Sequence, residues 1–166
     1  MADTYIQGSF AFRCTGTEAA LIEEAVLVAG DLSAHFDPDP PSAAFCAAFP
    51  PTKPDDPWSG LCDTFPDPDF PEIGADFARE DHPDAPGVNI VSFASMIDFQ
   101  PEAIAALIRR CCPATLDHAP IGFEWAVSCS KPRLGEFGGG WCVIHRDRIE
   151  IETTGERLVQ AFGTSR

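Results

Sequence analysis

The distribution of proline limits the fold of this chain more than any other feature. Eleven of its sixteen prolines lie between Asp31 and Asp84, in about a third of the 166 residues. Proline fixes its own φ and lacks a backbone N–H, so it interrupts helices and is excluded from central strands. The same segment holds too many large apolar side chains for a solvated linker. We therefore expect an excursion at about residues 31–86 that folds onto the core, with short helical turns at 42–49 and 56–63.

Outside this excursion, the sequence predicts strands that are each followed by a helix cap and a helix. Alternating apolar residues predict a strand at 5–14, and the capping box Thr15-Gly16-Thr17-Glu18 then starts a helix that reaches about residue 28 and stops at Gly30. A strand at 148–152 is followed in the same way by Thr153-Thr154-Gly155-Glu156 and an apolar stripe. The repeated order predicts two strand–helix units.

A third unit lies between these two. Residues 88–99 are rich in Val, Ile and Phe and predict a strand, and a single apolar stripe predicts a helix from Pro101 to Pro113. Residues 73–80 are a candidate for one more strand.

Alternation at 122–129 and again at 141–145 predicts a hairpin whose bend is Gly138-Gly139-Gly140. Simple antiparallel pairing places Cys129 opposite Cys142, and a longer loop would shift that register. Together, the predicted strands and helices form a single domain of the α+β class over residues 1–166. We expect a two-layer sandwich, ferredoxin-like or related, with an antiparallel or mixed sheet of five or six strands and two or three helices on one face.

Charge narrows the possible functions. Eleven Lys and Arg residues stand against twenty-six Asp and Glu residues, and the net charge is −15. A surface this negative repels nucleic acid and anionic membranes, which argues against a direct binder of either. The segment from Asp31 to Asp84 holds thirteen of the acids and two bases, Lys53 and Arg79.

This acidic segment predicts a contact surface for a basic protein partner. Carboxylates at short spacing would take the place of phosphates in a basic, nucleic-acid-binding groove, and neighbouring aromatic side chains would supply apolar anchors. A surface that only keeps the protein in solution is the alternative. The predicted partner-binding residues are Asp55, Asp56, Trp58, Asp63, Phe65, Asp67, Asp69, Phe70, Asp76, Asp81 and Asp84.

No catalytic residue, metal or cofactor is expected. The four histidines are scattered, and the glycine run at 138–140 lacks the Lys-Ser or Lys-Thr of a phosphate loop. Seven cysteines, an odd number, and an opening segment without signal-peptide character favour a reduced, cytoplasmic protein whose cysteines are small buried hydrophobes. One alternative is a small enzyme or redox sensor that uses Cys129, activated by Lys131 and Arg133, with His118 or His145 as its base.

Four segments carry a resemblance to a known group of proteins: residues 8–12, the block 122–130, residues 135–140, and the closing strand–helix unit that begins at residue 148. On these residues the chain resembles small uncharacterised proteins carried by bacterial plasmids, phages and integrative elements. The resemblance implies an accessory protein in the bacterial cytoplasm, without an assigned activity. By analogy, small acidic proteins of this kind include nucleic-acid-mimicking anti-CRISPR and anti-restriction proteins. We therefore expect a non-enzymatic inhibitor of a host defence complex, with a self-associating module, such as a homodimer, as a further alternative.

Overall fold

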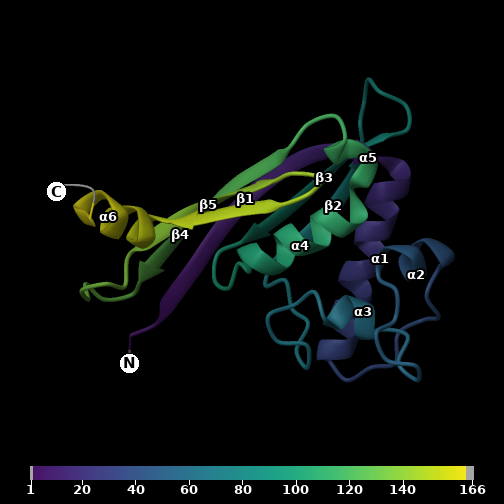
Figure 1. The fold of residues 1–166 in the computed structure, drawn as a ribbon, viewed down its shortest axis with the longest axis horizontal. Coiled ribbons are helices and arrows are strands. Elements are labelled where there is room, and N and C mark those ends of the chain that lie inside the picture. The colour runs from purple at the N-terminus through teal and green to yellow at the C-terminus, as the bar shows by residue number, and fades with distance from the viewer. Residues whose placement is uncertain (1, 164–166) are drawn as a thin grey trace.

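A six-stranded sheet forms the centre of the computed structural model, which describes residues 2–163 (Figure 1). Its order is β2-β3-β1-β4-β5-β6, and every neighbouring pair is antiparallel. The strands are β1 (Thr4–Thr15), β2 (Asp76–Asp81), β3 (Val88–Ser95), β4 (Ile121–Cys129), β5 (Gly138–Ile144) and β6 (Ile149–Thr153).

Helices cover one face of this sheet, which confirms the predicted α+β two-layer sandwich (Figure 1). The first four strands and two long helices follow the order β-α-β-β-α-β with β2-β3-β1-β4 in space, the ferredoxin-like arrangement, and β5 and β6 extend the sheet beyond β4. The helices are α1 (Gly16–Ser33), α2 (Ala43–Ala48), α3 (Ser59–Cys62), α4 (Pro101–Cys111), α5 (Pro113–Leu116) and α6 (Thr154–Gly163).

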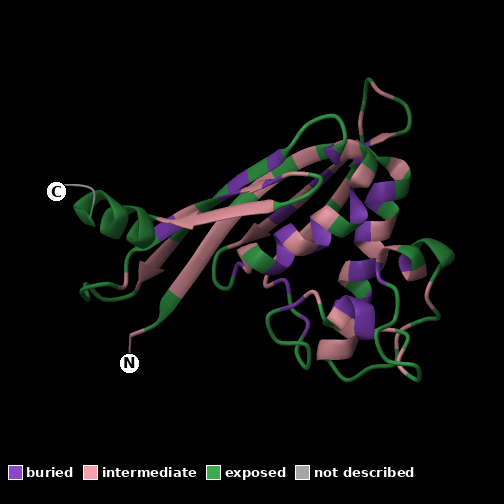
Figure 2. Ribbon diagram, viewed as in Figure 1, coloured by how far each residue is buried: buried purple, intermediate pink, exposed green. Residues whose placement is uncertain are grey.

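Aromatic rings fill the space between the sheet and the helices. The ring of Phe10 stacks on that of Phe123 with centroids 4.4 Å apart and on that of Phe93 at 5.6 Å. Phe99 closes this cluster edge-on. Figure 2 shows the buried residues concentrated where α1 and α4 meet the sheet, whereas α6 is exposed along its length and has no buried residue.

The proline-rich excursion is folded against α1, as its aromatic content predicted. The side chain of Ser42 caps α2 by accepting from the Phe45 N–H at 3.0 Å, and its own N–H donates to Glu24 of α1 at 2.8 Å. Phe45, Phe49 and Leu61 are fully buried. Both predicted helical turns are present, as α2 and the shorter α3.

The predicted end of the first helix was wrong. α1 continues through Gly30 to Ser33, because a glycine inside a helix costs only about 1 kcal/mol and does not by itself end it. The Ala34 N–H still donates to the Gly30 carbonyl at 3.0 Å, and the chain turns at His35, whose φ of 60° lies in the left-handed region.

The predicted hairpin bend was also wrong. Gly138, Gly139 and Gly140 belong to β5, the connecting loop runs over 130–137, and Trp125 pairs with Gly140. A Cβ atom on Gly140 would lie 2.3 Å from the Trp125 ring, so the glycine is needed where this indole crosses the strand. Cys129 consequently pairs with Thr4 of β1 and not with Cys142.

The strand predicted at 88–99 ends earlier, at Ser95. Beyond it the chain crosses to the start of β1, where the Ile6 N–H donates to the Ile97 carbonyl at 2.9 Å and the Phe99 N–H donates to the Ile6 carbonyl at 3.0 Å. This crossing places the Phe99 ring over Gly8, where a Cβ atom would lie 2.9 Å from it.

Candidate functional site

The aspartates predicted to bind a partner lie almost entirely at the surface. Seven of the eight are exposed and Asp56 is half-buried. Asp56 has a local structural role, because its Oδ1 accepts from the Trp58 N–H at 3.0 Å. Asp67 stabilises a turn in the same way by accepting from the Asp69 N–H at 3.1 Å. Two more of these aspartates accept side-chain hydrogen bonds, Asp63 from the Thr52 hydroxyl at 2.7 Å and Asp81 from the Asn89 amide at 2.8 Å.

The acidic charge of the excursion is not compensated by bases. Within the described residues 2–163, none of the thirteen carboxylates between Asp31 and Asp84 forms an ion pair. Arg79, one of the two bases of this segment, instead pairs with Glu23 of α1 at 3.0 Å. Structural salt bridges therefore do not account for the density of acids here.

The aromatic residues predicted as anchors separate into two groups. Phe65 is only 5% exposed and belongs to the core, and Trp58 is half-buried with its ring 5.4 Å from that of Phe45. Phe70, in contrast, is 55% exposed, and its ring lies 6.5 Å from that of His35. Sequence reasoning missed Phe36, which follows His35 and is 67% exposed; the signal for it was a phenylalanine next to the acidic, proline-rich Asp37–Pro41.

We call Phe36, Phe70, Asp67 and Asp69 the acidic–aromatic surface. It lies near the C-terminal end of α1, whereas Asp81 and Asp84 flank a loop near the N-terminal end, where the Gly16 N–H donates to the Gly87 carbonyl at 3.0 Å. The 18 residues of α1 span about 27 Å. The predicted aspartates thus lie near both ends of this helix and do not form one compact cluster.

The structure separates Cys129 from its predicted bases. Cys129 ends β4, whereas Ile121, at the other end, pairs with Ile144, which directly precedes His145. The nine residues of β4 place its ends about 27 Å apart. His118 lies in the connection that enters β4 at Ile121, again far from Cys129. Neither histidine can therefore serve as its general base.

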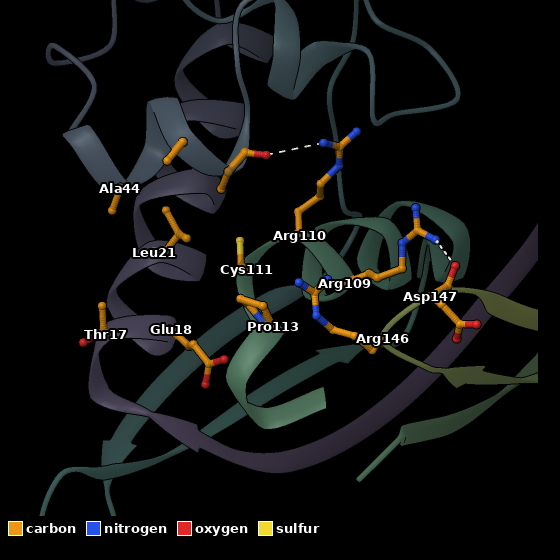
Figure 3. Close-up of a pocket in the computed structure, with 12 residues that line it drawn as sticks. Thr17, Glu18, Leu21, Ala44, Arg109, Arg110, Cys111, Pro113, Arg146 and Asp147 are labelled. Carbon is orange, nitrogen blue, oxygen red and sulfur yellow. Dashed lines mark hydrogen bonds between the residues drawn. The ribbon is translucent and has the colours of Figure 1, made fainter. Parts of the chain in front are cut away.

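A cavity of about 730 Å³ opens between α1, α2, the C-terminal end of α4 and the turn between β5 and β6 (Figure 3). Three arginines line it. The Arg109 guanidinium donates to the Asp147 carbonyl at 3.3 Å, and that of Arg110 donates to the Ala48 carbonyl at 3.5 Å. Arg146 pairs with the Asp117 carboxylate at 3.3 Å. Sequence analysis missed this cluster, because Arg146 is far from the other two in the chain.

Glu18 also lines the cavity, but its carboxylate is fully engaged. Oε1 accepts from the Thr115 N–H at 3.0 Å, and Oε2 accepts from the Thr115 hydroxyl at 2.6 Å and the Thr15 N–H at 3.1 Å. Burial alone would raise the pKa of Glu18, but the hydrogen bonds from Thr115 and Thr15 outweigh it and hold the pKa below its usual 4.5. Glu18 is therefore a charged structural group that joins α1 to α5.

Among residues 2–163, no group of three or more His, Cys, Asp or Glu side chains is placed to hold a metal ion. The helices in this part of the chain are all too short or too polar to cross a bilayer. Comparisons of the chain with protein-family models, with curated proteins and with solved structures found no match.

Proposed function

We propose that this chain is a non-enzymatic interaction protein. It docks on a basic, nucleic-acid-binding protein partner through the exposed carboxylates of the excursion at residues 31–86. The observation that carries the proposal is the absence, within residues 2–163, of any ion pair for the thirteen carboxylates between Asp31 and Asp84. Exposed charge without internal partners is free to pair with arginine and lysine on another molecule.

The exposure of the predicted aspartates supports a comparison with nucleic acid. Seven of the eight are exposed, and none of the eight forms an ion pair within residues 2–163. In this proposal the carboxylates compete with phosphates for the partner's cationic side chains. A nuclease complex of a host defence system is the partner class that the resemblance to mobile-element proteins favours.

Apolar contact would complete the interface, since exposed charge pairs alone contribute little binding energy. Phe36 and Phe70 are aromatic side chains available for this role, at 67% and 55% exposure. Phe70 follows Asp69 in the chain, and its ring lies 6.5 Å from that of His35, which precedes Phe36. In this arrangement the phenylalanines supply most of the affinity, and the aspartates supply association rate and salt dependence.

The test is capture of partners from a bacterial host lysate with three tagged baits. The first is the wild-type protein, the second carries Asp67→Lys and Asp69→Lys, and the third carries Asp3→Lys and Glu124→Lys, which lie outside the excursion, are exposed and change the net charge by the same amount. We expect a basic partner that wild type and the third bait retain at low salt and the second bait loses. Nucleic acid should then displace the purified partner from the protein.

Retention of the same partner by both charge-reversed baits would contradict the proposal, because Asp67 and Asp69 would then contribute nothing to binding. Loss of the partner from both baits would also contradict it, because net charge rather than this surface would then control binding. Phe70→Ala is the complementary variant. It should weaken the purified complex at every salt concentration, whereas the charge reversals should act mainly at low salt.

Self-association is a second candidate, favoured by the unusual exposure of α6. Leu158, Val159 and Phe162 form an apolar stripe on this helix and are 58%, 71% and 75% exposed. The helix follows β6, an edge strand whose second backbone edge has no partner within the described sheet. Pairing of two β6 edges would cover both the edges and the stripes. Sedimentation should then show a dimer that Leu158→Asp with Phe162→Asp converts to monomer; a wild-type monomer at high concentration would exclude this candidate.

A further inference from the structure

The arginine-lined cavity is the exception to the acidic character of this protein. Arg109, Arg110 and Arg146 are three of the nine arginines in a chain of net charge −15, and all three line the same cavity. Two of them come from the last turn of α4 and the third from the turn between β5 and β6. Figure 3 shows them across the cavity from Leu21 and Ala44 of α1 and α2.

Arg109 and Arg110 use few of their hydrogen-bond donors within the protein. A guanidinium carries five N–H donors. Arg109 and Arg110 each donate to one backbone carbonyl, at 3.3 Å and 3.5 Å, and neither forms an ion pair with a carboxylate within residues 2–163. What distinguishes Arg109 and Arg110 from other unpaired bases of the chain is that both line one cavity together with Arg146, where a single anion can meet all three guanidinium groups.

The two carboxylates that line the cavity keep their charge but already have partners other than these three arginines. Glu18 is held by Thr15 and Thr115, and the Asp147 carboxylate is engaged by Arg148 at 3.4 Å. Arginines in the last turn of a helix do stabilise the helix dipole, which is a structural reason for Arg109 and Arg110. That reason does not apply to Arg146, which reaches the same cavity from another element. Its guanidinium pairs with the exposed Asp117 carboxylate at 3.3 Å through Nε, and a bound anion would share it with that carboxylate.

Size and lining indicate the class of ligand. A volume of about 730 Å³ lies within the about 300–1,000 Å³ of sites that take small organic molecules. The wall formed by Leu21, Ala44 and Ala47 is apolar, and the opposite wall is cationic. Guanidinium groups match the geometry of phosphate oxygens, with two parallel N–H···O bonds from each fork.

We infer that this cavity binds a small phosphate monoester, with the phosphate on Arg109, Arg110 and Arg146 and the uncharged organic part against the wall of α1 and α2. A mononucleotide has this chemistry. The site is independent of the acidic–aromatic surface and of the proposed partner. Because the net charge of the protein repels anions at long range, binding depends on short-range contacts with all three guanidinium groups.

Isothermal titration calorimetry of the full chain with adenosine monophosphate, adenosine and inorganic phosphate tests the inference. We expect adenosine monophosphate to bind at least tenfold more tightly than either of the other two. Arg109→Gln with Arg110→Gln should weaken its binding at least tenfold. Arg146→Gln should also weaken it, and since this residue lies in an exposed turn, that variant separates loss of binding from loss of folding.

Arg133→Gln is the matched control, because this exposed arginine lies in the loop between β4 and β5, outside the cavity. It should leave the affinity unchanged. Equal binding of adenosine and adenosine monophosphate, or equal binding of inorganic phosphate and the nucleotide, would overturn the assignment of a phosphate monoester. Unchanged affinity in folded cavity variants, or no heat with any of the three probes, would overturn the site.

Discussion

Replacing Glu18 with Gln tests how much one buried carboxylate contributes to this fold. Glu18 is 5% exposed and accepts from the backbone N–H groups of both Thr15 and Thr115, one on each oxygen. A glutamine side chain has one carbonyl oxygen, so in either orientation its NH₂ group faces one of these two N–H donors. One buried donor then loses its acceptor, at about 1–3 kcal/mol, and the remaining bonds lose their charge assistance. We expect a total destabilisation of about 2–4 kcal/mol.

The second capping box provides the control. Glu156 accepts from the Thr153 N–H at 3.0 Å and from its hydroxyl at 2.8 Å, the same local arrangement, but it is exposed and α6 has no buried residue. Glu156→Gln should therefore cost less than about 1 kcal/mol. Urea unfolding followed by tryptophan fluorescence measures the stability of both variants. The urea concentration at the midpoint should fall, and the dependence of the unfolding free energy on urea concentration should not change. Equal costs for the two variants would refute the reasoning, since burial and the contacts with Thr115 would then contribute nothing.

The same carboxylate predicts a pH dependence. The pKa of Glu18 in the folded protein lies below its usual 4.5, so the contribution of the carboxylate to stability is complete above that value and is lost as the pH falls through the lower folded pKa. The stability difference between wild type and Glu18→Gln should therefore shrink as the pH is lowered below about 4.5. A difference that stays constant down to the acid-unfolding transition would show that the charge of Glu18 is not what stabilises the fold.

Three further outcomes are expected. Gly30→Ala should stabilise the protein by about 0.5–1 kcal/mol in urea unfolding, because Gly30 lies inside α1 and nothing lies within 4 Å of an added Cβ; a loss of stability would contradict this. Phe65→Ala should cost about 3–5 kcal/mol whereas Phe70→Ala should cost less than about 0.5 kcal/mol, since only the first side chain is buried; comparable costs would be inconsistent with the excursion as described. Burial raises the pKa of the Cys142 thiol to about 12, so alkylation of the native protein should modify the half-exposed Cys129 well before Cys142, and equal rates would contradict the strand register.

Local sequence patterns predicted the elements of this fold well. Thr15 with Glu18 and Thr153 with Glu156 are capping boxes in the structure, because the groups that satisfy one another lie within a single turn of chain. The α4 stripe is buried as expected, since a repeat of 3.6 residues puts its members on one side of the helix. The predicted end of α1 failed for the complementary reason: helix continuation past Gly30 depends on contacts with other elements.

Long-range pairings were decided only by the tertiary structure. The register of a hairpin depends on which side chains pack across its two strands. In the β4–β5 hairpin the Trp125 indole packs over Gly140 and fixes one register. The alternation of apolar residues fits this register and the predicted one equally well. Burial of Phe65 and exposure of Phe70 likewise depend on how the excursion folds against α1. Both phenylalanines have similar acidic, proline-rich neighbours in the sequence.

The sequence by itself determined the α+β class, the caps, the amphipathic helices and the concentration of acidic residues between Asp31 and Asp84. These follow from composition and from interactions a few residues apart. Only the tertiary structure brought Arg146 to Arg109 and Arg110, and Thr115 to Glu18, 97 positions earlier. The physical reason is that charge and hydrogen-bonding capacity can be read from the residue type, but the partner that satisfies each group is selected by the packing of the whole chain.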